Sequence, residues 1–470
     1  MRRRDERGPD ARLAQEQRQV QVVNRFMRNP LLAAARVAVA AMVLVGCDRI
    51  EEILPAFEEP LTPREGYVAA LESAGLGSTA LVSDWTVAGE RALLNPVTVT
   101  EPFAEDGYIA PEQPTALGWR FSARRGRRLT VTARIGPDSA AQLFVDLFEL
   151  PSDTADPPRQ VLTPEPGPVT LDFEPRRDGE YILRIQPELL RGGRYSVEIR
   201  SAAALGFPVQ DRSTRDIQSV FGDVRDGGRR DHHGVDIFAP RGTPVVAAAR
   251  GYVRRVRTTP RGGKVVWLRD DERGLSLYYA HLDSQLVESG QQVEIGDTLG
   301  LVGNTGNART TPPHLHFGIY QRGPIDPWWW VHHGDTTPSR LAVDTAAFGD
   351  WMRTTGDQIR LRAGPDEGFV AIAELPRHTA LHVIGGTGGW YRVALPDGRE
   401  GFIASRLTEA ADRPVQRTHL ATATAVHARP APDAAMIDRI APGEVAVLAR
   451  FGEYFLVRIE GRPAGWLALE

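Results

Sequence analysis

Short segments in which apolar and polar residues alternate recur along much of the chain, and this period of two is typical of β-strands with one buried face. Clear examples are residues 129–135, 181–185 and 195–199. Glycines stand at the breaks, and the 46 glycines and 35 prolines favour many turns over long helices. We therefore expect a mainly β protein, and a length of 470 residues predicts several domains rather than one core.

The overall charge narrows the function classes. The formal net charge is -4, with 42% hydrophobic and 25% charged residues, which is ordinary for soluble globular domains. A nucleic-acid binder needs a basic surplus to neutralise phosphates, so we expect no nucleic-acid partner.

The patterns divide the chain into six parts. These are a signal peptide (1–47), a tether with a short helical segment (48–117), a β-sandwich (118–205), a histidine-rich domain (206–335) and two repeats (350–410 and 416–470). In the tether, Thr62, Pro63 and Glu65 predict a helix start with a capping box. The sandwich contains no catalytic cluster, so it is interpreted as a spacer, with carbohydrate binding as the alternative.

The two C-terminal repeats match each other at three places. Residues 362–365, 389–393 and 401–403 recur as 429–432, 453–457 and 465–467. Each copy has the size of a small barrel and resembles bacterial SH3-like domains, which often bind cell-wall peptides. Trp390 and Trp466 fit this role or, in part, that of core aromatics of the barrels.

The single cysteine, Cys47, excludes an internal disulfide and ends a short apolar run, 37–46, that follows Arg28 and Arg36. A charged start, a brief apolar stretch and small residues at its end are typical of a secretory signal. The ending Leu-Val-Gly-Cys resembles the lipobox of bacterial lipoproteins, in which the cysteine is lipidated. The alternative is a buried free cysteine in an N-terminal helix.

The lipobox predicts a protein of the bacterial cell envelope, held to the membrane through Cys47 and facing the periplasm or the exterior. The apolar run is too short to span a bilayer as a helix. Met27 leaves a more compact signal than Met1 does. Inner and outer membrane both remain open.

Three histidine-bearing segments lie between residues 219 and 331. They are His232-His233-Gly234-Val235-Asp236, then Tyr278-Tyr279-Ala280-His281-Leu282, and then Pro313-His314-Leu315-His316-Phe317-Gly318-Ile319. On a strand, the last segment points Leu315, Phe317 and Ile319 to one face and the two histidines to the other. If the first segment is extended, His232 and Asp236 share a face, and Gly234 leaves space between them.

These residue types predict a zinc site. Neutral imidazole and carboxylate suit Zn²⁺, and His232, Asp236 and His316 make three protein ligands. Three ligands leave the fourth tetrahedral position for water, which is typical of a catalytic rather than a structural site.

The three segments resemble the lysostaphin/LytM family of zinc metallopeptidases, with His-x-Gly-x-Asp, Tyr-x-His-Leu and His-Leu-His-Phe in the family's order. Residues 300–306 are similar to its glycine-rich turn. The resemblance implies an antiparallel β domain of the duplicated-hybrid-motif type and a peptidoglycan substrate. It also implies that His232, Asp236 and His316 bind zinc, and that His281 and His314 are the catalytic histidines. No motif position departs from the pattern, so the ligand-lacking regulators of the family are a poor match.

The resemblance predicts an endopeptidase that hydrolyses peptide cross-links of peptidoglycan, with His314 favoured over His281 as the general base. His233 should face away from His232 and is interpreted as structural. Six histidines fall outside the motifs: His332, His333, His378, His382, His419 and His427. Residues 328–330, three tryptophans, are assigned to the core of the catalytic domain in preference to a wall of the cleft.

Two other functions remain open. One is a secreted endopeptidase acting on glycine-rich protein. The other is a non-catalytic envelope scaffold that activates a separate wall hydrolase. A regulatory envelope protein is a further partner that this organisation allows.

Overall fold

A computed structural model describes residues 61–136, 141–151, 156–225, 227–334, 336–458 and 464–468. The predicted signal peptide (1–47), including Cys47, lies outside these residues. In the part of the chain that is described, no helix is long and apolar enough to cross a membrane. The described elements are mostly strands, which confirms the predicted mainly β fold.

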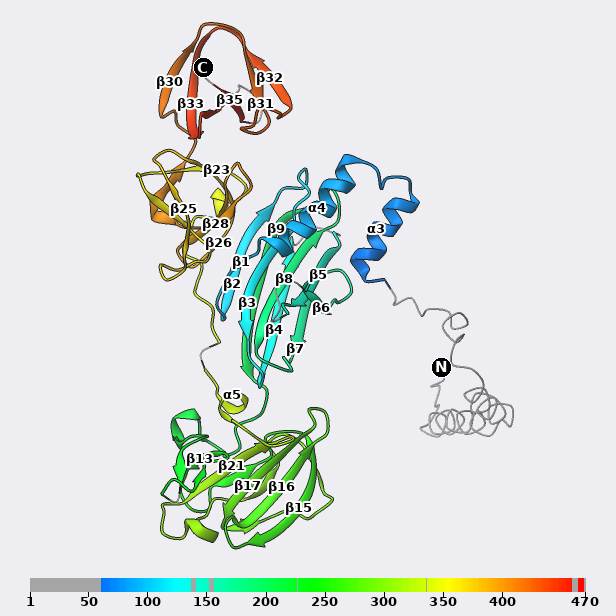
Figure 1. Cartoon of the computed structure of the whole chain (residues 1–470), viewed down its shortest axis with the longest axis vertical. Helices are drawn as coiled ribbons and strands as arrows, with labels where there is room; N and C mark the ends of the chain where they lie inside the picture. Colours follow the sequence, from blue (N-terminus) through cyan, green and yellow to red (C-terminus); the bar gives the residue numbers. More distant parts are fainter. Residues whose placement is uncertain are drawn as a thin grey trace, which may run out of the picture. The chain divides into compact units, whose positions relative to one another are not determined.

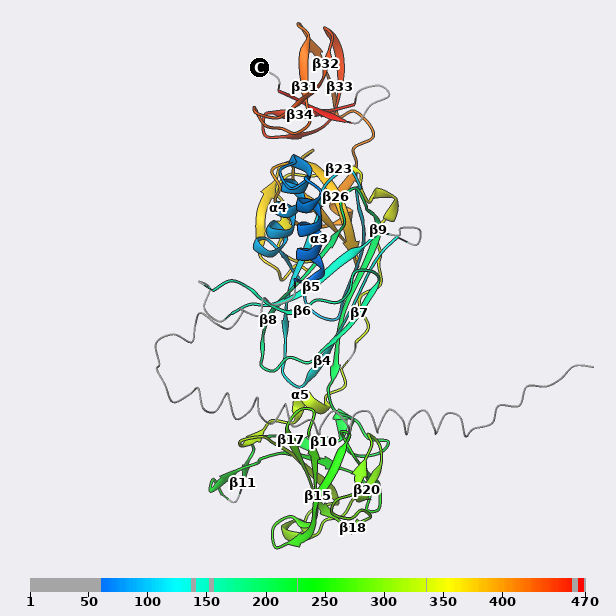
Figure 2. The ribbon, with the colours of Figure 1, turned by 90° about the vertical axis from the view of Figure 1, so that its right-hand side faces the viewer.

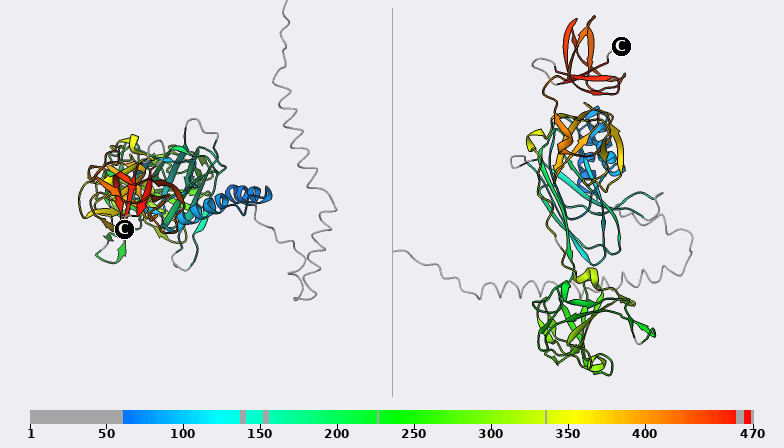
Figure 3. Two further views of the ribbon diagram at one scale, coloured as in Figure 1. Left: turned by 90° about the horizontal axis from the view of Figure 1, so that it is seen from above. Right: turned by 90° about the vertical axis from the view of Figure 1, so that its left-hand side faces the viewer.

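Two helices open the described chain, α3 (Pro63–Ser73) and α4 (Ala80–Leu94), drawn in blue in Figures 1 and 3. The predicted capping box of α3 is confirmed. The Glu65 N–H donates to Thr62 Oγ1, and the Thr62 N–H donates to the Glu65 carboxylate at 2.8 Å.

Helix α4 and two strands correct the expected tether, since residues 80–109 are folded. The buried residues of α4 have helical spacing: Val82, Trp85, Gly89 and Ala92. Trp85 is 1% exposed, and its indole N–H donates to the Pro187 carbonyl at 2.8 Å. This face covers the sandwich, so the sandwich unit begins well before residue 118.

The sandwich consists of two mainly antiparallel layers, which Figure 2 shows edge-on. One layer has the order β1 (Val97–Thr98), β3 (Leu117–Ala123), β8 (Gly179–Pro187), β5 (Leu143–Glu149) and β6 (Arg159–Leu162), with β1 parallel to β3. The other has β2 (Phe103–Ile109), β9 (Gly193–Ala203), β4 (Arg127–Ile135) and β7 (Val169–Phe173). The alternating residues used for the prediction line the core between the layers.

The two C-terminal repeats have the same strand order. The first has β25 (Ala371–Leu375), β24 (Ile359–Arg362), β28 (Glu400–Ala404), β27 (Trp390–Ala394) and β26 (Ala380–Thr387), and then β23 (Trp351–Thr354), which pairs with β26, and β29 (Thr408–Ala410), which pairs with β23. The second has β32 (Met436–Ile440), β31 (Thr424–His427), β35 (Gly465–Ala468), β34 (Tyr454–Val457), β33 (Gly443–Phe451) and β30 (Gln416–Leu420). Trp466 is a core residue at 2% exposure, whereas Trp390 is half-buried.

The first barrel is joined to the sandwich by backbone pairing. β26 pairs antiparallel with β2, with Gly386 opposite Asp106 and Gly385 opposite Gly107. A Cβ at Gly107 would lie 2.4 Å from the Ile384 carbonyl oxygen, so this close approach requires glycine. The sandwich and the first barrel therefore share one continuous sheet.

The histidine-rich domain is built on a sheet with the order β10 (Ile217–Ser219), β13 (Val235–Phe238), β21 (His314–Tyr320), β17 (Leu275–Leu282), β16 (Gly263–Asp270), β15 (Gly251–Thr259) and β19 (Gln292–Val293). β22 (Pro324–Ile325) pairs with β21, and β14 (Pro244–Val246), β20 (Thr298–Leu301) and β18 (Ser284–Gln285) form a smaller sheet. As predicted, Leu315, Phe317 and Ile319 are fully buried in the core. The hairpin of β11 (Val224–Arg225) and β12 (Arg230–Asp231) stands at the edge of this domain (Figure 2).

The three tryptophans form the short helix α5 (Trp328–Val331) where this domain meets the sandwich. Trp330 is 6% exposed and belongs to the domain core, as expected. It also contacts the sandwich, because a Cβ at Gly126 would lie 2.9 Å from its ring. The guanidinium of Arg124 lies 4.5 Å from the Trp329 ring centre. The segment thus anchors one domain on the other.

Candidate active site

Three of the predicted site residues meet at one point. Nε2 of His232 lies 3.0 Å from Oδ1 of Asp236 and 2.9 Å from Nδ1 of His316. The same Nδ1 and Oδ1 atoms are 3.0 Å apart. Within the described ranges, this is the one cluster of histidine and acidic side chains whose ligand atoms converge closely enough to hold a metal ion.

The chemistry of the cluster fits a cation. Nδ1 of His232 lies 2.8 Å from the Val220 carbonyl oxygen, which can only accept, so Nδ1 carries the hydrogen. Nε2 of His232 and Oδ1 of Asp236 therefore both present lone pairs to the same point. Ligand atoms about 2.0–2.1 Å from a tetrahedral zinc are about 3.3 Å apart. The observed separations are a few tenths of an ångström shorter, so zinc fits after a small outward movement.

Strand pairing brings these distant residues together. β13 pairs with β21 in a register that sets Asp236 opposite His316. The expectation of a single extended segment is corrected, because β13 begins only at Val235 and His232 lies in the preceding loop. There the His232 backbone N–H donates to the Asp223 carbonyl at 2.9 Å. The bend at Gly234 lets His232 and Asp236 reach the same point.

Gly234→Ala should weaken both the site and the fold. A Cβ there would lie 2.5 Å from the Phe317 carbonyl oxygen and 2.7 Å from Cε1 of His316. Because the first neighbour is backbone, β13 and β21 must separate. We expect a loss of about 1–3 kcal/mol of unfolding free energy and weaker zinc binding, measured by urea unfolding and chelator competition.

Gly323→Ala is the matched control, because nothing lies within 4 Å of its Cβ. Its unfolding free energy should change by less than about 0.5 kcal/mol. Equal stability and equal zinc affinity of the two variants would contradict the steric role of Gly234.

The local electrostatics hold the cluster in the protonation states that a metal needs. Burial alone raises the pKa of Asp236, but the hydrogen bonds and charges of His232 and His316 lower it well below its ordinary value. Burial lowers the pKa of His316. An ionised carboxylate beside a neutral imidazole is the ligand state that binds zinc without losing protons first.

The two predicted catalytic histidines stand beside the cluster. The ring centre of His281 lies 5.1 Å from that of His314 and 6.0 Å from that of His316. Nδ1 of His281 donates to the Thr305 carbonyl at 2.8 Å, and Nδ1 of His314 donates to the Pro312 carbonyl at 2.9 Å. Each ring therefore keeps a lone pair on Nε2 and can accept a proton there.

His281 has two further features of a functional residue. Its φ of 63° lies in the left-handed region, which is uncommon for a residue with a side chain. Burial, followed by the charges of His314 and His316, lowers its pKa to about 4, so the ring is neutral at neutral pH. The ring of His314 is held by stacking on Phe238, with ring centres 5.0 Å apart.

All five site residues line a cleft of about 660 Å³. One wall is aromatic: the ring centres of Trp267 and Tyr278 are 4.5 Å apart, and Tyr320 lies 5.3 Å from Trp267. Tyr278 also contacts the His316 ring at 5.9 Å. Arg225 and Arg261 add positive charge to the lining.

The cleft includes residues that no motif identifies. Arg225 and Ser219 are examples, because they reach the cluster through the hairpin and the loop before His232 rather than by strand spacing. His233 is exposed and stacks on Phe221 at the rim of the cleft, outside the ligand cluster. The six histidines assigned to no motif do not line the cleft.

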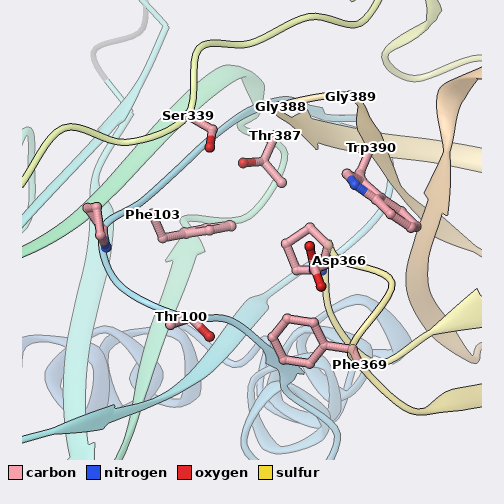
Figure 4. A pocket seen from close by; sticks show the side chains of 11 residues that line it. Thr100, Phe103, Ser339, Asp366, Phe369, Thr387, Gly388, Gly389 and Trp390 are labelled. Carbon is pink, nitrogen blue, oxygen red and sulfur yellow. The ribbon is translucent and has the colours of Figure 1, made fainter. Parts of the chain in front are cut away.

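A second cavity, of about 500 Å³, lies between the sandwich and the first barrel (Figure 4). Trp390, Phe369 and Asp366 line it from the barrel, and Thr100 and Phe103 from the sandwich. Asp366 is the one titratable side chain in its lining, and it accepts from the Gly368 N–H of its own loop at 2.8 Å. This second cavity therefore lacks the histidines that line the first cleft.

Comparison with known protein families gives a match for two parts of the chain. Residues 230–327 match Peptidase family M23, and residues 357–409 match the bacterial SH3 domain. An L-Ala--D-Glu endopeptidase of Bacillus subtilis is 37% identical over 130 residues, which is 26% of this chain and 40% of that protein. The peptidoglycan DD-endopeptidase ShyA of Vibrio cholerae is 40% identical over 92 residues, 20% of this chain and 21% of that protein.

Among solved structures, the catalytic domain of lysostaphin from Staphylococcus simulans is 30% identical, with a TM-score of 0.22, and the match covers 24% of this chain and 88% of that one. The matches to the endopeptidases of Bacillus subtilis and Vibrio cholerae, in contrast, span less than half the length of those two proteins. The domain that carries the five site residues is nevertheless assigned by sequence. The chain contains a domain of Peptidase family M23, followed by a bacterial SH3 domain.

Proposed function

We propose that this protein is a zinc-dependent endopeptidase that hydrolyses peptide cross-links of bacterial peptidoglycan. The observation that carries the proposal is the convergence of His232, Asp236 and His316 within one cleft, with His281 and His314 beside them. Of the two relatives described above, one is an L-Ala--D-Glu endopeptidase and the other a peptidoglycan DD-endopeptidase, which supports a wall peptide as substrate.

In this proposal His232 Nε2, Asp236 Oδ1 and His316 Nδ1 hold the metal. When bound, zinc supplies Lewis-acid chemistry that makes water a nucleophile near neutral pH. His314 and His281 provide proton transfer, because each offers a free Nε2 lone pair while its Nδ1–H is held by a carbonyl. One takes the proton of the attacking water and passes it to the leaving amine nitrogen as the peptide bond breaks. The other, after taking a proton from solvent, would stabilise the developing oxyanion.

The flanking parts suit a substrate fixed in the envelope. We propose that the bacterial SH3 domain at residues 357–409 and the second repeat hold the enzyme to the wall. We also propose that Cys47 is lipidated and keeps the protein at the membrane, as its sequence context predicts. A regulatory envelope protein would then act on an enzyme that is already in place.

Digestion of purified peptidoglycan sacculi tests the proposal. The full-length protein with zinc should release defined muropeptides whose masses identify the bond that is cut. A chelator should abolish release, and added zinc should restore it. Cleavage of soluble glycine-rich protein but not of sacculi would reassign the substrate. Stimulation of a separate hydrolase by chelated protein, without release by the protein alone, would favour the scaffold function.

A further inference from the structure

The carboxylate of Asp236 is divided between two partners. Its Oδ1 faces His232 and His316, at 3.0 Å from each nitrogen. Its Oδ2 accepts a hydrogen bond from Nη2 of Arg225 at 3.0 Å. Asp236 is buried, and the Arg225 side chain is 28% exposed, so the pair is partly shielded from water.

Arg225 is itself held in place by the loop before His232. Its Nη2 also contacts Ser219 Oγ, and this hydroxyl donates to Asp223 Oδ2 at 2.8 Å. The Asp223 carbonyl accepts from the His232 backbone N–H at 2.9 Å. One network therefore joins Arg225 to two of the three candidate ligands, His232 and Asp236.

We propose that Arg225 is a positioning residue that keeps one oxygen of Asp236 away from the metal. With Oδ2 engaged by the guanidinium, only Oδ1 is free to coordinate, and the coordination position that Oδ2 would take stays open for water or substrate. This inference rests on the proposed zinc site.

The proposal predicts how the Arg225→Ala variant behaves. Zinc affinity of the full-length protein, measured by chelator competition, should fall about 10–100-fold, as is usual when a ligand loses its outer partner. With Co²⁺ in place of zinc, the visible absorption should weaken, because Oδ2 swings in and raises the coordination number. Arg225→Lys should keep more of the zinc affinity, and added guanidinium should partly rescue Arg225→Ala.

Arg250→Ala is the matched control, because Arg250 is 77% exposed and pairs with Glu294 at 3.2 Å, outside the lining of the cleft. An Arg225→Ala protein with the zinc affinity and Co²⁺ spectrum of this control would overturn the proposal. So would a variant that loses affinity through unfolding alone, without rescue by lysine or guanidinium. If the unaltered protein binds no zinc, the proposed function fails instead, and this result is distinct from the other two.

Discussion

His314→Ala should retain zinc while losing about 10²–10⁴-fold in kcat on peptidoglycan, and His281→Ala should do the same. Neither ring offers an atom to the ligand cluster. Each Nδ1–H is hydrogen-bonded to a backbone carbonyl, and the atoms that converge belong to His232, Asp236 and His316. Removing either ring therefore removes proton transfer or oxyanion stabilisation but not the metal. Zinc content and muropeptide release are measured on the same preparations.

His316→Ala should behave differently and lose both zinc and activity, because Nδ1 of His316 is one of the three converging atoms. His333→Ala, at an exposed histidine outside the cleft, serves as the control and should keep both. Loss of zinc in His314→Ala, or full activity in His281→Ala, would refute the division of roles. The larger kcat loss of the two would identify the general base.

Arg392→Ala should destabilise the sandwich and the first barrel by about 3–5 kcal/mol, because it leaves a buried charge without its partner. Arg392 in β27 is 1% exposed and contacts Glu105 of β2 at 3.4 Å and Glu400 of β28 at 2.8 Å. Glu105 also accepts from the Tyr195 hydroxyl at 2.6 Å. Burial raises the pKa of Glu105, so its charged form depends on these partners.

Urea unfolding followed by tryptophan fluorescence measures this effect. Arg360→Ala is the control, since both members of its pair with Glu374 are more than half exposed, and its cost should stay below about 1 kcal/mol. Arg392→Met combined with Glu105→Gln removes both charges and should recover part of the loss. A single Arg392→Ala variant as stable as Arg360→Ala would show that the pair does not hold the two domains together.

Patterns within a few residues of each other were readable from the sequence alone. Alternation predicted the core-facing residues Leu315, Phe317 and Ile319, because side chains on a strand point to opposite faces in turn. The capping box at Thr62 was readable for the same reason, since both partners lie within one turn. The histidine motifs identified the domain that the family comparison assigns.

Tertiary structure alone decided the features that join distant parts of the chain. The pairing of β2 with β26 and the contact of Glu105 with Arg392 link residues about 280 positions apart, and no local pattern encodes such a register. Helix α4 was not predicted from the sequence. Its buried face packs on the sandwich, and Trp85, for example, bonds to Pro187, which lies about 100 positions away in the sequence. The role of Arg225 was missed because its contact with Asp236 depends on how the β11–β12 hairpin folds back toward the site, and no sequence spacing indicates this. Sequence therefore determined the strands and the candidate ligands, and long-range packing determined what orients and holds them.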